Sequence, residues 1–165
     1  MIFSLTVLVR KIRRNKDFIF IGVIHPGSIE ATEPSLHDST MDINLRTPFV
    51  LMQFFLEYLR DSRGCVVNVS CDKGSRPEPG LISYCMSKAG LEMMTKSTAM
   101  ELAPFGIRVN AVAPSFVETN LYRSAGMSEP ELDALKKRAT NNIPMAKVSQ
   151  STEIAKAIIF LTSEQ

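Results

Sequence analysis

Short apolar runs alternate with longer segments of helical periodicity along this chain. Runs rich in β-branched residues that end at glycine or proline are typical of buried strands, and longer runs with a helical period are typical of helices. Strands that alternate with helices form βαβ units, which build a parallel sheet covered by helices on both faces. On this basis we expect strands at residues 17–24, 64–70 and 107–112, helices at 41–59, 83–103 and 151–161, and one or two short helices within 118–137.

Three other segments carry weaker patterns. Residues 28–40 are polar, and residues 72–80 contain two glycines and two prolines, so both predict loops. Apolar residues recur at helical spacing across residues 5–12, which predicts an amphipathic helix. The basic cluster at 10–16 then lies on a solvated helix face, and a targeting or phosphate-binding role is the alternative.

Composition narrows the classes of protein. The 165 residues suffice for one domain, 45% of them are hydrophobic, and the net charge is only +2. This charge predicts neither nucleic acid nor an anionic membrane as a partner. The N-terminal apolar stretch is too short to span a bilayer, and its basic residues follow it, unlike those of a secretory signal. Three cysteines and two histidines without metal-ligand spacing predict no metal site and a reducing, cytoplasmic location.

Tyr84 and Lys88 are candidate catalytic residues. They stand four residues apart near the start of the helix expected at 83–103, and this spacing places both side chains on one helical face. A phenol with a pKa of about 10 is a poor base at neutral pH, but a nearby ammonium favours the phenolate and lowers that pKa. The pair therefore predicts a general acid/base unit.

Several motifs accompany this pair in a fixed order: MDINL, VVNVSC, YCMSKAGLEMMTKSTAMELAPFGIRVNAVAPSFVET and IPMAKVSQSTEIAKAIIFLTSE. With them the chain resembles the short-chain dehydrogenase/reductase family, most strongly over residues 41–163. The likeness is to the C-terminal two-thirds of a 3-oxoacyl-ACP-reductase-like member. It implies a single truncated α/β domain over residues 1–165. That domain would hold a partial Rossmann-type parallel sheet, with helices on both faces and without the N-terminal βαβ units.

The resemblance implies an NAD(P)-dependent oxidoreductase that interconverts a small carbonyl compound and an alcohol. Tyr84 would exchange a proton with the substrate oxygen. Lys88 would lower the pKa of Tyr84 and hold the ribose of NAD or NADP, and Asn44 would support a proton relay through water. The hydride chemistry belongs to the cofactor. Taken singly, Tyr84 and Asn44 also fit ordinary helix residues.

The same resemblance implies a cofactor-binding turn and an oligomer. Pro114, Val117 and Thr119 would embrace the nicotinamide, although Thr119 also suits the cap of a following helix. The helices at 41–59 and 83–103 correspond to those that pack against partner subunits in the family, which implies a homo-oligomer. Core packing is the alternative explanation of their apolar faces.

The catalytic serine of the family lies thirteen residues before the tyrosine, a position that is Cys71 here. Neighbouring residues on a strand point to opposite faces, so Ser70 is expected to point away from the site that Cys71 faces. A thiol is a weak hydrogen-bond donor and would stabilise a developing oxyanion less well than a hydroxyl. The alternative is that Cys71 is an inert small residue.

Other departures concern the cofactor. No two glycines lie two residues apart, so the glycine-rich phosphate cradle of the family is absent. Gly27 is the one residue kept from the family's Asn-Asn-Ala-Gly motif, and we assign it to cofactor binding. Ser115 replaces a glycine and would be strained if its φ were positive. Without further strands, the one at residues 17–24 is expected to form a bare apolar edge.

Three interpretations follow. The first is an NAD(P)-dependent oxidoreductase that interconverts a carbonyl compound and an alcohol. This chain would be inactive if cofactor binding requires the missing phosphate cradle. The second is a non-catalytic interaction module of the same descent, and the third is a truncated gene product. Binding of a dinucleotide distinguishes the first from the second.

Overall fold

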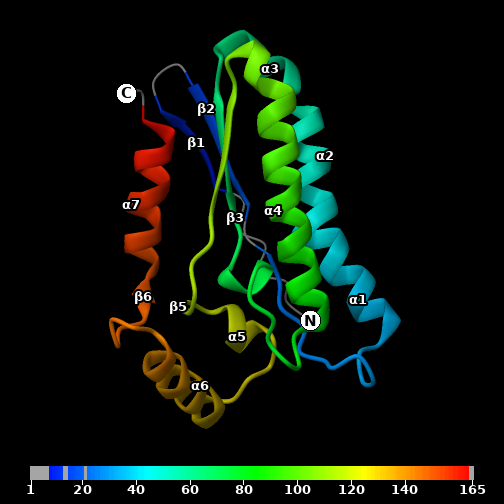
Figure 1. The fold of residues 1–165 in the computed structure, drawn as a ribbon, viewed down its shortest axis with the longest axis vertical. Coiled ribbons are helices and arrows are strands. Elements are labelled where there is room, and N and C mark those ends of the chain that lie inside the picture. Colours follow the sequence, from blue (N-terminus) through cyan, green and yellow to red (C-terminus); the bar gives the residue numbers. More distant parts are fainter. Residues whose placement is uncertain (1–7, 13–14, 21, 164–165) are drawn as a thin grey trace.

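A four-stranded sheet forms the centre of the computed structural model, which describes residues 8–12, 15–20 and 22–163 (Figure 1). The strand order is β1-β2-β3-β4. β2 is parallel to β3, and β3 is parallel to β4. This arrangement confirms the predicted α/β class and its partial parallel sheet. The strands are β1 (Leu8–Ile12), β2 (Asn15–Phe20), β3 (Cys65–Val69) and β4 (Arg108–Val112).

The N-terminal segment is a strand, so the amphipathic helix predicted for residues 5–12 is wrong where it is described. β1 pairs antiparallel with β2, from Leu8 opposite Ile19 to Ile12 opposite Asn15. Helical spacing over so few residues is a weak signal, and hydrogen bonds to an open strand edge override it. The edge of β2 that was expected to be bare is therefore paired. Residues 5–7 of the predicted helix lie outside the described residues.

Helices cover both faces of the sheet (Figure 1). One face carries the run from α1 to α3 together with α4, and α3 contacts β2 while α4 contacts β4. The other face carries α7, which contacts β3 and β4. The helices near this sheet are α1 (Pro34–Met41), the π-helix η1 (Asp42–Arg46), α2 (Thr47–Phe54), α3 (Leu56–Ser62), α4 (Ile82–Leu102) and α7 (Ser151–Thr162).

The loop predicted for residues 28–40 is too long, because α1 already begins at Pro34. Proline suits a first helical turn, where its fixed φ is helical and its missing N–H has no intrahelical partner. Helical structure then continues to Ser62 with a break at Phe55, whose φ of −94° and ψ of 3° leave the helical range. The predicted helix at 41–59 is therefore three consecutive segments, beginning with a π-helix.

An apolar core lies between α2, α3 and α4 on one side and β3 and β4 on the other. Leu59 is wholly inaccessible and Val66 almost so. Burying side chains of this size stabilises a fold by about 1.5–3 kcal/mol each. The core fixes α4 against the sheet, and α4 carries the candidate catalytic pair. Its buried members are Met52, Leu59, Val66, Leu102, Ile107 and Val109.

The remaining elements lie beyond the C-terminal ends of β3 and β4 (Figure 1), except for the 3₁₀ turn Ala103–Phe105, which joins the end of α4 to the start of β4. Both helices of this region begin within the predicted range 118–137, but α6 continues to Asn142 and is longer than predicted. Among the described residues no helix is both long and apolar enough to cross a bilayer. Of the described non-glycine residues, only Arg63 and Ala146 have positive φ, so the strain predicted for Ser115 does not arise. The elements are α5 (Leu121–Ser124), α6 (Glu129–Asn142), the paired strands β5 (Val117–Glu118) and β6 (Ser149–Gln150), and two 3₁₀ turns, Asp72–Gly74 and Ala103–Phe105.

Candidate active site

The first turns of α4 bring Tyr84 and Lys88 to the C-terminal end of β3. Both residues are buried, with 6% of Tyr84 and 3% of Lys88 exposed. Lys88 Nζ donates a hydrogen bond of 2.8 Å to the carbonyl of Val69, the last residue of β3. It also lies 5.6 Å from the centre of the Tyr84 ring. The spacing of four residues thus places Tyr84 and Lys88 on the same face of α4, at the end of β3.

Ser70 and Cys71 follow β3 and have different surroundings. The buried Ser70 hydroxyl donates to Glu92 Oε1 at 3.0 Å. The half-buried Cys71 thiol donates to Asp72 Oδ1 at 3.3 Å and lies close enough to Tyr84 for each to change the pKa of the other. Cys71 has extended backbone angles, φ −156° and ψ 152°, so the strand alternation persists there. Cys71, rather than Ser70, shares the site with Tyr84.

Burial dominates the electrostatics of this cluster. It raises the pKa of the Cys71 thiol, an effect to which Asp72 adds and which a backbone hydrogen bond with Lys73 opposes. Burial and the nearby Cys71 raise the pKa of Tyr84 well above its ordinary value of 10.0. Desolvation lowers the pKa of Lys88 from 10.5 to about 8. The predicted direction for Tyr84 is therefore wrong, because burial outweighs the effect of the ammonium beside its ring.

Asn44 lies in the π-helix η1, only 2% exposed, and its amide is fully engaged. Asn44 Oδ1 accepts from the backbone N–H of Val23 at 2.8 Å, and Nδ2 donates to the Val23 carbonyl at 2.8 Å and to Ser87 Oγ at 3.0 Å. The chain after β2 is thus joined to α4 through one side chain. A π-helical turn inside a helical run is a frequent feature of functional sites.

Gly22 is a site residue that the sequence reasoning missed. A Cβ there would lie 2.0 Å from Asn44 Oδ1, so only glycine lets the chain pass the amide. The available signal was a glycine directly after the apolar run FIFI. Gly27, the predicted cofactor residue, lies instead at a loop junction beside the start of α4, where its N–H donates to the Gly80 carbonyl at 2.7 Å. A role for Gly27 in cofactor binding stays a prediction.

The predicted nicotinamide turn lies next to the Cys71 loop. The N–H of Asp72 donates to the Pro114 carbonyl at 3.0 Å, which ties the two loops together. Val117 belongs to β5, and Thr119 Oγ1 accepts from the Leu121 N–H at 3.4 Å. Thr119 precedes the N-cap residue of α5, which is Asn120, so the capping alternative for Thr119 is wrong. Its role toward a cofactor stays a prediction.

Aromatic side chains add an apolar wall that the sequence reasoning did not single out. Phe116 and Tyr122 stack with their ring centres 5.4 Å apart and their planes 12° from parallel. Burial, together with nearby Cys71 and Asp72, raises the pKa of Tyr122 to about 12, so the Tyr122 phenol stays protonated near neutral pH. Farther out, Glu78 pairs with Lys73 at 3.0 Å and with Arg138 of α6 at 3.5 Å.

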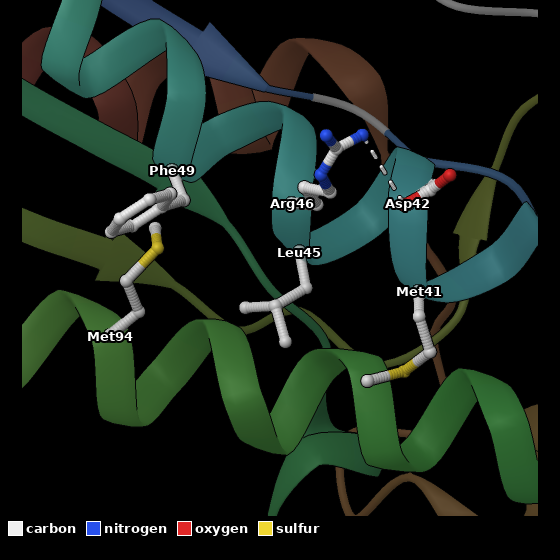
Figure 2. A pocket seen from close by; sticks show the side chains of 6 residues that line it. All are labelled: Met41, Asp42, Leu45, Arg46, Phe49 and Met94. Atoms are coloured by element: carbon white, nitrogen blue, oxygen red, sulfur yellow. Dashed lines mark ion pairs between the residues drawn. The ribbon is translucent and has the colours of Figure 1, made fainter. Parts of the chain in front are cut away.

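A separate pocket of about 360 Å³ lies between η1 and α4, on the surface of the helical layer (Figure 2). Figure 2 shows Leu45, Phe49 and Met94 pointing into it, while the ion pair of Asp42 and Arg46, at 3.7 Å, lies at its edge. Neither Tyr84 nor Lys88 lines this pocket. It is therefore distinct from the candidate catalytic cluster.

The donors present fit part of a dinucleotide. Lys88 has three N–H donors and gives one to Val69, so it can also hold ribose hydroxyls near Tyr84. The pyrophosphate has no counterpart, because the sequence contains no glycine-rich cradle. Among the described residues, no group of three or more His, Cys, Asp or Glu side chains could hold a metal ion.

Comparison with known proteins agrees with this geometry. The family described as "Enoyl-(Acyl carrier protein) reductase" matches residues 15–165. An uncharacterized oxidoreductase of Thermotoga maritima is 34% identical over 145 residues, which are 87% of this chain and 58% of that protein. The 3-oxoacyl-[acyl-carrier-protein] reductase FabG of Rickettsia bellii is 38% identical over 129 residues, 78% of this chain and 51% of that protein.

Solved structures show the same relationship. A short-chain dehydrogenase/reductase of unknown function from Caenorhabditis elegans, determined with cofactor, superposes with a TM-score of 0.80 at 28% identity, covering 88% of this chain and 57% of that one. The ligand-free aldohexose dehydrogenase of Thermoplasma acidophilum gives 0.81 at 27% identity, covering 89% and 60%. The parallel sheet and these likenesses place the chain in the Rossmann-type α/β class of folds. Within it, the chain belongs to the short-chain dehydrogenase/reductase family, and it spans about half the length of the curated relatives it matches.

Proposed function

We propose that this chain carries the proton-transfer half of an NAD(P)-dependent oxidoreductase that interconverts a carbonyl compound and an alcohol. The observation that carries the proposal is the meeting of Tyr84, Lys88 and Cys71 at the C-terminal end of β3. Sites in open α/β sheets lie at this end of the strands. The odd number of cysteines in the sequence, three, also suits a reducing, cytoplasmic location, which we include in the proposal.

The residues divide the work in the reduction direction. Tyr84, kept protonated by its raised pKa, gives the phenolic proton to the substrate oxygen as the carbonyl becomes an alcohol. Lys88 holds the nicotinamide ribose and supplies positive charge beside the phenolate that forms. The Cys71 thiol donates a weak hydrogen bond to the substrate oxygen. The cofactor, when bound, supplies the hydride.

Asn44 acts differently from the relay role that the resemblance implies. Its side-chain donors and acceptor are occupied by Val23 and Ser87, so the amide holds the chain after β2 against α4 rather than passing a proton. We therefore propose that Asn44 positions the helix that carries Tyr84 and Lys88. Any relay through water would have to use other groups.

The aromatic stack suggests a class of substrate. Phe116 and Tyr122 form an apolar wall beside Cys71, which suits a substrate with a hydrocarbon chain or ring next to its carbonyl. The FabG relatives are named as 3-oxoacyl-[acyl-carrier-protein] reductases, and a 3-oxoacyl thioester meets this description. We propose such thioesters as the first substrates to test.

The test is titration of the chain with NADH and NADPH by calorimetry, followed by reduction of a 3-oxoacyl thioester. Binding of either cofactor by the wild-type chain, with at least tenfold weaker binding by Lys88→Ala, supports the proposal. Tyr84→Phe should keep cofactor binding and lose reduction, whereas Tyr58→Phe, a half-exposed tyrosine on α3, should behave as wild type. Failure of both cofactors to bind at millimolar concentration contradicts the proposal and leaves the non-catalytic interpretation.

A second proposal concerns association of copies of the chain. Large apolar side chains remain exposed on α2 and α4, among them Phe54 at 71% and Met93 at 62%, and Phe49, exposed at 46%, also lines the pocket of Figure 2. Exposed patches of this kind mark association surfaces. We propose a homo-oligomer through these helices. Light scattering should show an oligomer that Phe49→Asp dissociates and that Lys137→Asp, at an exposed position of α6, does not; a monomeric wild-type chain contradicts the proposal.

A further inference from the structure

Glu92 lies on α4 one turn beyond Lys88, and the two side chains hold successive residues of the same strand end. Lys88 Nζ donates to the Val69 carbonyl at 2.8 Å, and Glu92 Oε1 accepts from the Ser70 hydroxyl at 3.0 Å. Ser70 is only 3% exposed. A hydrogen bond from a hydroxyl to a carboxylate is stronger than one between neutral groups, and the other acceptor of this hydroxyl, the Lys88 carbonyl, is farther away at 3.4 Å. Glu92 therefore fixes the residue immediately before Cys71.

Glu92 also contacts the turn after Cys71. A Cβ on Gly74 would lie 2.5 Å from Glu92 Oε1 and 3.0 Å from the backbone carbon of Lys88, so the Asp72–Gly74 turn lies directly on α4. The Gly74 N–H donates to the Cys71 carbonyl at 2.9 Å. Cys71 thus lies between Ser70 and Gly74, and both of these residues lie against the carboxylate of Glu92.

We propose that Glu92 is a positioning residue, which holds the Cys71 turn closed on α4 and thereby keeps the Cys71 thiol beside Tyr84. The inference rests on the proposed function only for the role of Cys71 toward substrate. The placement of the thiol itself is independent of cofactor, substrate and turnover. Loss of the Glu92 contact should let the turn open and expose the thiol to water.

The test is alkylation of Cys71 by iodoacetamide between pH 7 and 11, followed by mass spectrometry of the peptide that contains it. The thiolate is the reactive form, so the pH at half-maximal rate reports the pKa of Cys71. Burial is the main cause of the raised pKa, so opening of the turn lowers it. For Glu92→Ala we expect a midpoint lower by about half a unit, which is about a threefold faster reaction at pH 8.

Loss of the Glu92 charge is the alternative cause of a lower pKa at Cys71, and two variants separate it from positioning. Glu92→Gln removes the charge and keeps an oxygen that accepts from Ser70, so its profile should return to that of wild type. Ser70→Ala keeps the charge and removes the hydrogen bond, so it should reproduce the shift. The Ser70→Ala result also decides the matter if Glu92→Ala does not fold. Glu101→Ala, at an exposed position of the same helix, is the matched control.

Two results would overturn the proposal. One is a Glu92→Ala chain with a lower melting temperature and an unchanged Cys71 profile, which would make Glu92 a stabilising residue only. The other is a Glu92→Gln profile equal to that of Glu92→Ala, which would assign the effect to charge. Absence of cofactor binding in the separate titration would contradict the proposed function and leave this outcome unaffected.

Discussion

Replacement of Lys88 by methionine should stabilise the folded chain while removing its catalytic cation. Desolvation lowers the pKa of Lys88 from 10.5 to about 8. Each pKa unit corresponds to about 1.4 kcal/mol, so burial of the protonated side chain costs about 3 kcal/mol at pH 7. Methionine has a similar length and no charge, but it loses the charge-assisted hydrogen bond to Val69, worth about 2 kcal/mol. We expect Lys88→Met to raise the free energy of unfolding by about 1 kcal/mol at pH 7.

The sign of this effect depends on pH. A folded-state pKa below the unfolded value means that the folded chain binds fewer protons than the unfolded chain between about pH 8 and 10.5. The wild-type free energy of unfolding therefore gains a rising contribution across this window, and Lys88→Met lacks it. Raised pKa values at Cys71 and Tyr84 act in the opposite direction in both chains. The difference between variant and wild type isolates Lys88 and should shrink as the pH rises.

Urea unfolding at pH 7 and at pH 9.5 measures both quantities. At pH 7 the gain corresponds to a melting temperature higher by about 2–4 °C for a chain of this size. Lys96→Met, at an exposed position of α4, is the matched control and should change the stability by less than about 0.5 kcal/mol. A Lys88→Met chain that is less stable than wild type at pH 7, or equally affected at both pH values, would refute the reasoning. It would mean that the ammonium has polar partners enough to offset its burial.

Three further changes test the neighbouring residues. Asn44→Ala leaves the buried N–H and carbonyl of Val23 without partners and should cost about 2–5 kcal/mol in urea unfolding, whereas the exposed Asn142→Ala should cost less than about 0.5 kcal/mol. Gly22→Ala places a methyl group 2.0 Å from the Asn44 amide oxygen and should cost about 1–3 kcal/mol, and a neutral result would show that this oxygen can move aside. Cys71→Ser supplies a stronger donor to the substrate oxygen and should raise the reduction rate; a flat or lower rate would remove Cys71 from the serine position.

The parts of the fold that the sequence predicts well are those with a strong local pattern. β3, α4 and β4 fall within a few residues of their predicted bounds, because each is a β-branched or helical run closed by glycine or proline. The N-terminal segment fails for the opposite reason. The apolar positions of this short run fit both the helical and the strand spacing. Pairing with the neighbouring strand decides between them, and that pairing exists only in the folded chain. Pro34 indicates the start of α1, but the polar composition of residues 28–40 favours a loop and led to the wrong prediction.

The candidate site likewise has features that the sequence predicts and features that it does not. Its residue types and their order along the chain were predictable, since Tyr84, Lys88 and Cys71 occupy fixed spacings. Its electrostatics were not, because the pKa of Tyr84 depends on burial, which spacing does not encode. The contact between Gly22 and Asn44 is a tertiary approach between segments with no shared motif, so only the structure reveals it.

Because η1 is a π-helical turn, the number of residues in it matters as much as their identity. A π-turn holds one residue more than the α-helical turn it replaces, and here the Thr47 N–H donates to the Asp42 carbonyl five residues back. Loss of Leu45 or Arg46 would let ordinary α-helical bonds form, which turns Asn44 by about 100° relative to α2 and withdraws its amide from Val23. Single-residue deletions in η1 should therefore destabilise the fold far more than substitutions of its exposed side chains, such as Asp42→Asn.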